Sequence, residues 1–283
     1  MTYLITGATG NIGSLVVERL IKRGERPRIF VRDQQKALAN FGDRVDVFVG
    51  DLSDAATMKS ALTGANALLL LTSGHDLAAQ DDAAAKAAKA AGVKHLVKLS
   101  SYDAGEQNVG TGVWHADGES AVRASGIEYT FVRPSGFMSN ALFWARSIKA
   151  DGVVRTATGD GKIPFIHPHD IADVAMEALV SGAYRGSSLP ITGPEALSYA
   201  EMAEKIAAVI GKPIRFQPIS DEEARQQQVA WGAPPQLAAA RLSIFRAIRE
   251  GRLATVTDTL KLVLGRPPLN FDQWVRENAE AFR

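Results

Sequence analysis

The segment MTYLITGATGNIGSLVVERLIKRG, residues 1–24, determines the fold that we expect for the whole chain. Its residues 3–6 form a short β-branched and aromatic run, which favours a strand. The apolar residues of positions 15–21 fall on one helical face until Gly24 ends the pattern. Three glycines lie between the two patterns. The segment therefore predicts a strand, a glycine turn and a helix that follow one another directly.

The glycine turn has the parts of a phosphate-binding turn. Gly7 would permit a tight bend, Gly10 would let the backbone approach a pyrophosphate, and Gly13 would let the helix pack closely on the strand. The N-terminus of the helix offers free N–H groups to an anion. The spacing is G-x-x-G-x-x-G rather than G-x-G-x-x-G, and an ordinary strand-to-helix turn is the plainer alternative. The flanking strand and amphipathic helix favour a dinucleotide site.

The composition is that of an ordinary globular protein. The chain has 283 residues, 46% hydrophobic and 22% charged, so it can bury a full core. Its 32 basic and 31 acidic residues give no charge excess that would favour nucleic acid or an anionic membrane. The lack of cysteine excludes disulfides, a thiol nucleophile and cysteine-bound metals. With no signal-peptide pattern and no membrane-spanning apolar run, we expect a cytoplasmic protein.

Strand and helix patterns alternate along the first two thirds of the chain. Further strands are expected at residues 28–32, 45–50, 65–72, 94–100, 127–132 and 188–192. Helices are expected at residues 54–62, 76–91, 114–124 and 170–180. This alternation predicts an α/β fold of the Rossmann type, with a doubly wound parallel sheet. Pro134 is expected to leave the sheet, and Lys98 to reach solvent from a strand end.

The expected domain boundary lies at Gly193. Residues 1–193 would form the NAD(P)-binding Rossmann domain, with an irregular excursion over 134–168 that contributes to the substrate pocket. Residues 194–283 would form a smaller, mainly helical substrate domain. Its helices are expected at residues 198–210, 220–231, 235–250 and 271–281, the first two with a serine N-cap and a glutamate three residues later.

The end of the second strand predicts which nucleotide binds. In this fold an acidic residue there binds the 2′-hydroxyl of NAD, and a basic one binds the 2′-phosphate of NADP. Arg32 and Lys36 favour NADP(H) over NAD(H), because N–H donors match a phosphate. Asp33 complicates this choice of nucleotide, because it is an acidic residue at the same strand end. The alternative is that Asp33 only forms a surface ion pair with Arg32.

Five motifs together resemble one family. TGATGNIG starts the chain, VR follows the second strand, GD follows the third, and W-H-x-x-x-E and VRPSGFMSNALFWA flank the sixth. They are similar to the NmrA-like branch of the atypical short-chain dehydrogenases/reductases, strongly over residues 1–193 and more loosely beyond. That branch includes NADPH-dependent quinone and triphenylmethane-dye reductases, and a catalytically silent redox-sensing regulator.

The resemblance implies roles for residues at the strand ends. The implied cofactor residues are, for the pyrophosphate turn, Gly7, Thr9, Gly10, Asn11, Ile12 and Gly13; for the 2′-phosphate, Arg32 and Lys36; for the adenine, Asp51 and Leu52; and for the nicotinamide half, Thr72, Ser73, Ser100, Ser101 and Pro134. The implied substrate-binding residues are Phe137, Met138 and Trp114.

The catalytic positions depart from the family's usual Tyr-x-x-x-Lys. His115 stands where the lysine would be and Thr111 where the tyrosine would be. A quinone, azo or cationic dye acceptor requires no placed acid, because water can protonate its stabilised product. The candidate catalytic residues are His115, whose unperturbed pKa lies near neutrality, and Tyr102. The alternative for His115 is a plain helix-face bond to Glu119.

Other constellations are interpreted as structural. His167, His169 and Asp170 would form a helix start with Asp170 as its cap, and no metal site is expected. Trp231 and other aromatic residues of the helical tail would belong to the core or to a substrate lid. The partner that we expect is a small-molecule substrate, with no nucleic acid and no membrane; a homodimer is left open.

Two functions stay open from the sequence. The first is an NADPH-dependent oxidoreductase that transfers hydride to a conjugated acceptor such as a quinone or a dye. The second is a non-catalytic NADP(H)-binding redox-sensing regulator of the NmrA type. An epimerase of nucleotide sugars is disfavoured, because that chemistry needs the missing Tyr-Lys pair. The apolar residues expected around the nicotinamide favour the enzyme.

Overall fold

The computed structural model describes residues 1–105 and 109–283, so part of the loop expected before the 114–124 helix lies outside the described residues. Its strands in the main sheet coincide with the expected apolar runs. They are β1 (Tyr3–Thr6), β2 (Arg28–Val31), β3 (Asp46–Val49), β4 (Ala67–Leu70), β5 (His95–Leu99), β6 (Tyr129–Pro134) and β9 (Ser187–Ile191).

In the described part of the chain these strands form one seven-stranded sheet in the order β3-β2-β1-β4-β5-β6-β9. Every neighbouring pair is parallel. The strand order reverses beside β1, which is the point where ligands bind in open α/β sheets. The expected Rossmann-type fold is therefore confirmed.

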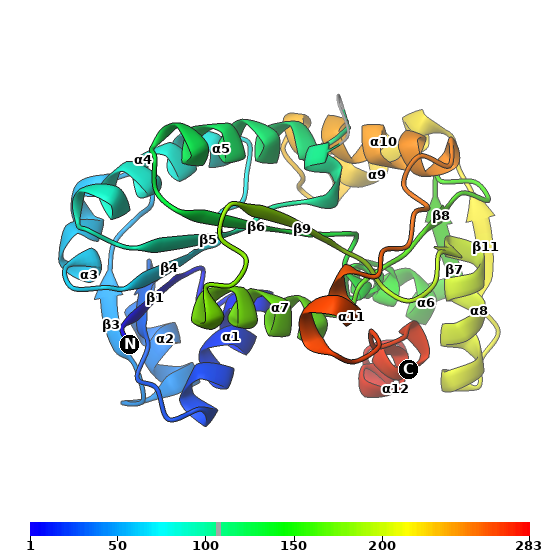
Figure 1. Cartoon of the computed structure of the whole chain (residues 1–283). Helices are drawn as coiled ribbons and strands as arrows, with labels where there is room; N and C mark the ends of the chain where they lie inside the picture. The colour runs from blue at the N-terminus through cyan, green and yellow to red at the C-terminus, as the bar shows by residue number, and fades with distance from the viewer. Residues whose placement is uncertain (106–108) are drawn as a thin grey trace.

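Helices cover both faces of the sheet (Figure 1). One face carries α4 (Leu77–Ala90) and α5 (Gly112–Ala124), with α3 (Lys59–Leu62) after a short 3₁₀ turn, η1 (Ala55–Met58). The other carries α1 (Asn11–Lys22), α2 (Gln34–Phe41) and α7 (Pro168–Ser181). Apolar side chains from both faces of the strands are buried under these two layers, which makes the sheet the centre of the core.

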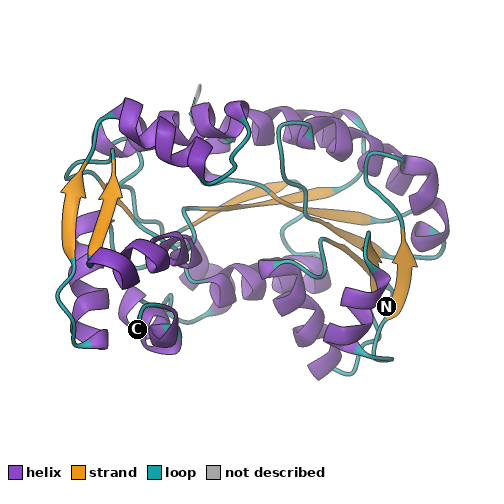
Figure 2. Ribbon diagram, turned by 180° about the vertical axis from the view of Figure 1, so that it is seen from behind, coloured by secondary structure: helices purple, strands orange, loops and turns teal. Residues whose placement is uncertain are grey.

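A second hydrophobic cluster lies beyond the carboxyl ends of the strands (Figure 2). It joins the excursion after β6 to the last third of the chain. The excursion contains η3 (Met138–Trp144), α6 (Ala145–Asp151), β7 (Val153–Thr156) and β8 (Lys162–Ile163). The last third contains β10 (Leu197–Ser198), α8 (Tyr199–Ile210), β11 (Arg215–Pro218), α9 (Asp221–Ala230), α10 (Pro235–Arg249), α11 (Thr259–Leu264), α12 (Phe271–Glu277) and η4 (Ala279–Ala281).

Both serine caps that the sequence predicts are present. Ser198 and Glu201 form a reciprocal capping box at α8, and Ser220 and Glu223 form one at α9. Each box satisfies two backbone N–H groups at the start of its helix. The division of the chain at Gly193 stays a prediction. Among the described residues, no helix combines the length and the apolar character needed to cross a bilayer.

Pro134 does not leave the sheet, so that expectation is wrong. It is the last residue of β6 and pairs with Ile191 of β9. The neighbour on the other side, β5, ends at Leu99 opposite Val132, so Pro134 lies beyond the last residue of that strand. A proline fits this position because its missing N–H faces a side without a partner strand.

Candidate functional site

Two cavities open at the carboxyl edge of the sheet, as expected for ligand sites in this fold. The smaller one, of about 200 Å³, lies where β1 to β4 end. Seven of the expected cofactor residues line it: Gly7, Thr9, Arg32, Asp51, Leu52, Thr72 and Ser73. The ends of four strands thus bring together residues that are up to 66 positions apart in the sequence (from 7 to 73).

The glycine turn has the geometry of a pyrophosphate cradle. Gly7 has a φ of 59°, and a Cβ on Gly13 would lie 2.2 Å from the Gly7 carbonyl oxygen, so the helix start approaches the turn too closely for a side chain. In the described structure, helix α1 begins after Gly10 without a side-chain cap and without an acidic residue in its first turn. The first N–H groups, including those of Asn11 and Ile12, are therefore available to an anion.

The end of β2 presents one basic side chain to this cavity. Arg32 is exposed and lines it, and Lys36 is exposed in the first turn of α2. Asp33 is the N-cap of α2, where its carboxylate accepts the Lys36 backbone N–H at 2.9 Å. The expected ion pair between Asp33 and Arg32 is therefore wrong, because the carboxylate is used by the helix start.

Asp51 is held in shape by its own loop. Its carboxylate accepts the backbone N–H of Ser53 at 2.9 Å and the Ser53 hydroxyl at 2.7 Å. These two hydrogen bonds, opposed by slight desolvation and aided by the charge of Arg32, lower the pKa of Asp51. The group is thus an acceptor at neutral pH, suited to the N–H and O–H groups of an adenosine.

A buried ion pair lies under the wall between the cavities. Lys98 is fully buried, 2.6 Å from the equally buried Asp81, so the expectation that Lys98 reaches solvent is wrong. Burial raises the pKa of Asp81 and lowers that of Lys98, and their mutual attraction opposes both shifts. Thr72 donates to Asp81 at 2.8 Å. A Cβ on Gly118 of α5 would lie 2.0 Å from Asp81, which explains a glycine inside that helix. The pair therefore holds Thr72 in the cofactor cavity.

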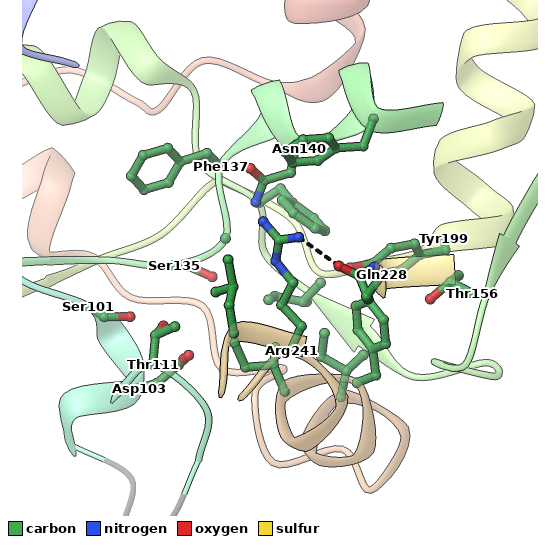
Figure 3. Close-up of a pocket in the computed structure, with 18 of the residues that line it drawn as sticks. Ser101, Asp103, Thr111, Ser135, Phe137, Asn140, Thr156, Tyr199, Gln228 and Arg241 are labelled. Atoms are coloured by element: carbon green, nitrogen blue, oxygen red, sulfur yellow. Dashed lines mark hydrogen bonds between the residues drawn. The ribbon is translucent and has the colours of Figure 1, made fainter. Parts of the chain in front are cut away.

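The larger cavity, of about 350 Å³, lies beyond the ends of β5 and β6 and is enclosed by α9 and α10 (Figure 3). Its lining is mostly apolar with a few polar groups, the usual composition of a small-molecule site. Five of the expected residues line it: Ser100, Ser101, His115, Pro134 and Phe137. The residues expected at the nicotinamide thus open into a space large enough for an acceptor.

Glu119 fixes the Ser100 side of this cavity. It is buried, and it accepts hydrogen bonds from Ser100 Oγ at 2.7 Å, from Arg133 Nε at 2.7 Å and from Arg123 Nη2 at 3.1 Å. The hydrogen bond to Glu119 raises the pKa of Arg133 despite partial burial. Among the described side chains, no hydrogen bond joins His115 to Glu119, so the alternative of a helix-face bond does not hold.

His115 faces the cavity as a neutral imidazole. Burial, assisted by the nearby charge of Lys98, lowers the pKa of His115 to about 3. Its Nδ1 is shielded from solvent and has no hydrogen-bond partner among the described residues. The pKa of His115 is thus far below the unperturbed value near neutrality, and its role in proton transfer stays a prediction. The ring can give or accept a hydrogen bond at pH 7, but it does not carry the extra proton.

Eight expected residues line neither cavity in the described structure: Gly10, Asn11, Ile12 and Gly13 of the glycine turn, Lys36, and the acceptor-side residues Met138, Trp114 and Tyr102. Met138 is buried in the second hydrophobic cluster, Trp114 is half-buried on α5, and Tyr102 is half-buried in a 3₁₀ turn. Their roles in binding or catalysis stay predictions. Trp231 of the helical tail lines the larger cavity, as the lid interpretation expects, whereas Trp274 is in the core.

Sequence patterns missed several polar residues of the larger cavity. They come from the excursion and the helical tail, and they include Asn140, Thr156, Tyr199, Gln228 and Arg241 (Figure 3). Asn140 lies in the VRPSGFMSNALFWA motif but was given no role there, and the other four belong to no local motif. The apolar periodicity of the sequence predicts α9 and α10 as helices, but it does not predict which face of each helix meets the cavity.

Asp170 is not the cap that the sequence suggests. His167 caps α7, and its Nδ1 accepts the His169 backbone N–H at 3.1 Å. Asp170 is fully buried in the first turn, where it accepts the Leu269 backbone N–H at 2.7 Å and pairs with Arg266 at 2.7 Å. It therefore joins α7 to the segment that precedes α12.

Comparison with known proteins gives the family. The model of an NAD(P)H-binding family matches residues 7–181. The chain is 38% identical to (4-alkanoyl-5-oxo-2,5-dihydrofuran-3-yl)methyl phosphate reductase of Streptomyces griseus, over 99% of this chain and 98% of that one. It is 36% identical to NAD(P)H azoreductase of Xenophilus azovorans, again over 99% and 98%. The NADPH complex of an Escherichia coli quinone oxidoreductase superposes with a TM-score of 0.89, at 29% identity over 98% and 99%.

The chain thus belongs to the NAD(P)H-binding family. The expected resemblance to the NADPH-dependent reductases of the NmrA-like branch is confirmed by these relatives. The expected NADP(H) cofactor and the assignment to the NAD(P)H-dependent reductases are confirmed with it.

Proposed function

We propose that the protein is an NADPH-dependent reductase that transfers hydride to a flat conjugated acceptor such as a quinone or a dye. The observation that carries the proposal is that two cavities open at the same carboxyl edge of the sheet: the cofactor cavity at β1 to β4 and the mostly apolar cavity at β5 and β6. The names of the relatives, an azoreductase and a quinone oxidoreductase, support this acceptor class. A third relative is named for a substrate that carries a phosphate.

The chain's own residues would bind and orient the reactants. The cradle at Gly7 and Gly13 fits a pyrophosphate, and Arg32 would bind the 2′-phosphate. NADPH, once bound, would supply the hydride. Phe137 and Pro134 would hold the nicotinamide and the acceptor face to face in the larger cavity.

The protonation state of His115 supports an acceptor that needs no enzyme acid. Its imidazole is neutral at pH 7, because burial lowers the pKa of His115 to about 3. A ketone would yield a strongly basic alkoxide, whereas a reduced quinone or dye is stabilised and can take its proton from water. His115 would then orient the acceptor or the ribose through a hydrogen bond.

We propose further that the part of the chain after Gly193 supplies the acceptor side of the site, since α9 and α10 line the larger cavity. A cytoplasmic location is supported by the lack of cysteine, and the absence of a nucleic-acid partner by the balanced charge. A homodimer stays a prediction.

The direct test follows NADPH oxidation by absorbance with purified protein and a panel of quinones, azo dyes and triphenylmethane dyes. Turnover with NADPH and at least one conjugated acceptor is the expected result. Tight NADPH binding without turnover on any acceptor would refute the reductase function and favour the non-catalytic regulator.

Arg32→Ala tests the cofactor assignment. Loss of a charge-assisted contact to the 2′-phosphate should raise the KM for NADPH roughly 10- to 100-fold and leave the KM for NADH nearly unchanged. Arg23→Ala, which removes an exposed arginine after the far end of α1, is the matched control. Equal changes for both nucleotides in Arg32→Ala would refute the assignment of Arg32.

A further inference from the structure

Arg241 is a cation in the larger cavity that has no countercharge among the residues that the structure describes. It lies on α10, half-buried, and lines the cavity. Its Nη1 donates to the Gln228 amide oxygen at 2.6 Å, the contact drawn in Figure 3. Among the residues that the structure describes, no carboxylate forms an ion pair with it. Asp103, the acidic residue of the lining, lies beside Thr111 in the figure, away from the guanidinium.

Neighbouring arginines are paired, which makes Arg241 the exception. Arg246, on the same helix, lies 3.1 Å from Asp221. Arg155, which also lines the cavity, lies 2.7 Å from Asp151. A guanidinium has five N–H donors, and the contact to Gln228 uses one of them. Because a partly desolvated charge is costly without a partner, an anion that reached Arg241 would be bound favourably.

The groups that touch Arg241 orient it without neutralising it. Gln228 is 3% exposed and offers a neutral acceptor. The guanidinium also lies 5.4 Å from the centre of the Phe143 ring, an arrangement that favours the cation. Phe143 in turn stacks at 6.4 Å on Trp231, and both rings are largely exposed. In the described part of the chain, the cavity thus combines flat aromatic surface with a positive charge that has no acidic partner.

We propose that Arg241 forms a subsite for an anionic group, a phosphate, sulfonate or carboxylate, carried by the conjugated acceptor. This inference rests on the proposed reductase function and names the substrate class of the same cavity. The planar fork of the guanidinium matches two oxygens of such a group. The ring system of the acceptor would lie toward Phe137, and its anionic substituent toward α10.

The test compares two acceptors that share a ring system, 1,4-naphthoquinone and 1,4-naphthoquinone-2-sulfonate. We compare the ratio of kcat/KM for the sulfonate to kcat/KM for the parent in the natural protein, Arg241→Gln, Arg241→Lys and Arg246→Gln. The ratio should fall roughly 10- to 100-fold in Arg241→Gln, recover in part in Arg241→Lys, and stay within about twofold in Arg246→Gln. Because the ratio is internal to each variant, differences in active fraction cancel.

A binding measurement separates this inference from the proposed function. Calorimetric titration with naphthalene-2-sulfonate, in the presence of NADP⁺, reports the subsite without turnover. Its Kd should rise in Arg241→Gln by the same factor as the ratio falls, and not in Arg246→Gln. Equal ratios and equal Kd values in these two variants would overturn the anionic subsite while leaving the reductase intact. A natural protein that reduces neither these quinones nor any dye of the panel would refute the function, and the titration would still decide the subsite.

Discussion

His95 and His115 are two residues whose charge is set by burial rather than by sequence. Burial, with a smaller contribution from Arg185, lowers the pKa of His95 to about 4. His95 is 1% exposed, and its Nε2 shares a hydrogen bond with Thr130 at 2.9 Å. In the unfolded chain a histidine titrates near 6.5. Between these two values the unfolded chain binds a proton that the folded chain does not, so the free energy of unfolding falls as pH falls.

His95→Gln should therefore reduce the acid sensitivity of the protein. Relative to the natural protein, the drop in the free energy of unfolding between pH 7 and pH 5 should shrink by roughly 2 kcal/mol, because one of the linked protons is removed. Urea titrations at the two pH values measure this difference. His75→Gln removes an exposed histidine and should leave the drop unchanged. A drop of the same size in His95→Gln and the natural protein would contradict the assignment.

At the scale of single residues, the sequence predicts the cofactor-binding residues better than the acceptor-binding residues. Gly7, Gly13 and Arg32 belong to a local strand-turn-helix pattern, so their proximity follows from chain order. Arg241 and Gln228 lie on two later helices and reach the cavity only through the tertiary arrangement. The protonation state of His115 likewise depends on burial under distant residues, which no spacing in the sequence encodes.

At the scale of the elements, the first turn of α7 is bound to a segment about 100 residues later in the chain. Asp170 accepts the Leu269 backbone N–H and pairs with Arg266, so one carboxylate holds the segment between α11 and α12 against the helix. A negative charge in a first turn also interacts favourably with the helix dipole. The side chain is fully buried, which raises the cost of leaving its partners without an acceptor.

Asp170→Ala should lower the free energy of unfolding by about 2–3 kcal/mol, because the half-buried Leu269 N–H and the Nη1 of Arg266 lose their acceptor, while Arg266 keeps its pair with Asp173. Glu177→Ala, two turns later on the same helix, is the matched control, with an expected change of under about 0.5 kcal/mol. Chemical denaturation of both variants measures the effect. If the two losses were alike, the carboxylate of Asp170 would not be what holds this segment.

The elements themselves were predictable where the signal is local. The buried strand at residues 67–70 is a near-continuous apolar run, and the α8 start has a complete capping box. Strand β11 was missed because its four residues, RFQP, are mostly exposed and form a strand only by pairing with β7, some 60 residues earlier. Helix α2 was missed because it is short and only weakly apolar, with a start set by Asp33.

At the scale of the whole molecule, the chain passes from the sheet to the second hydrophobic cluster three times: after β6, after β9 and after α11. After α10 it returns to the sheet, where Thr257 donates to Thr192 at 3.0 Å and to the Pro190 carbonyl at 2.9 Å. Helix α11 then buries Leu260 in the core of the sheet, and α12 goes back to pack on α8. Neither part can unfold without exposing apolar surface of the other, so we expect one cooperative transition.

Thermal unfolding followed by two probes tests this coupling. Two tryptophans, Trp144 and Trp274, are buried in the second hydrophobic cluster, so fluorescence reports mainly that part, whereas far-ultraviolet circular dichroism reports every helix and strand. The two curves should coincide. NADPH at about 100 times its Kd should stabilise the folded chain by about 2.7 kcal/mol and raise the single Tm by roughly 5–10 °C. An earlier fluorescence transition that NADPH does not shift would mean that the second cluster unfolds independently of the nucleotide site.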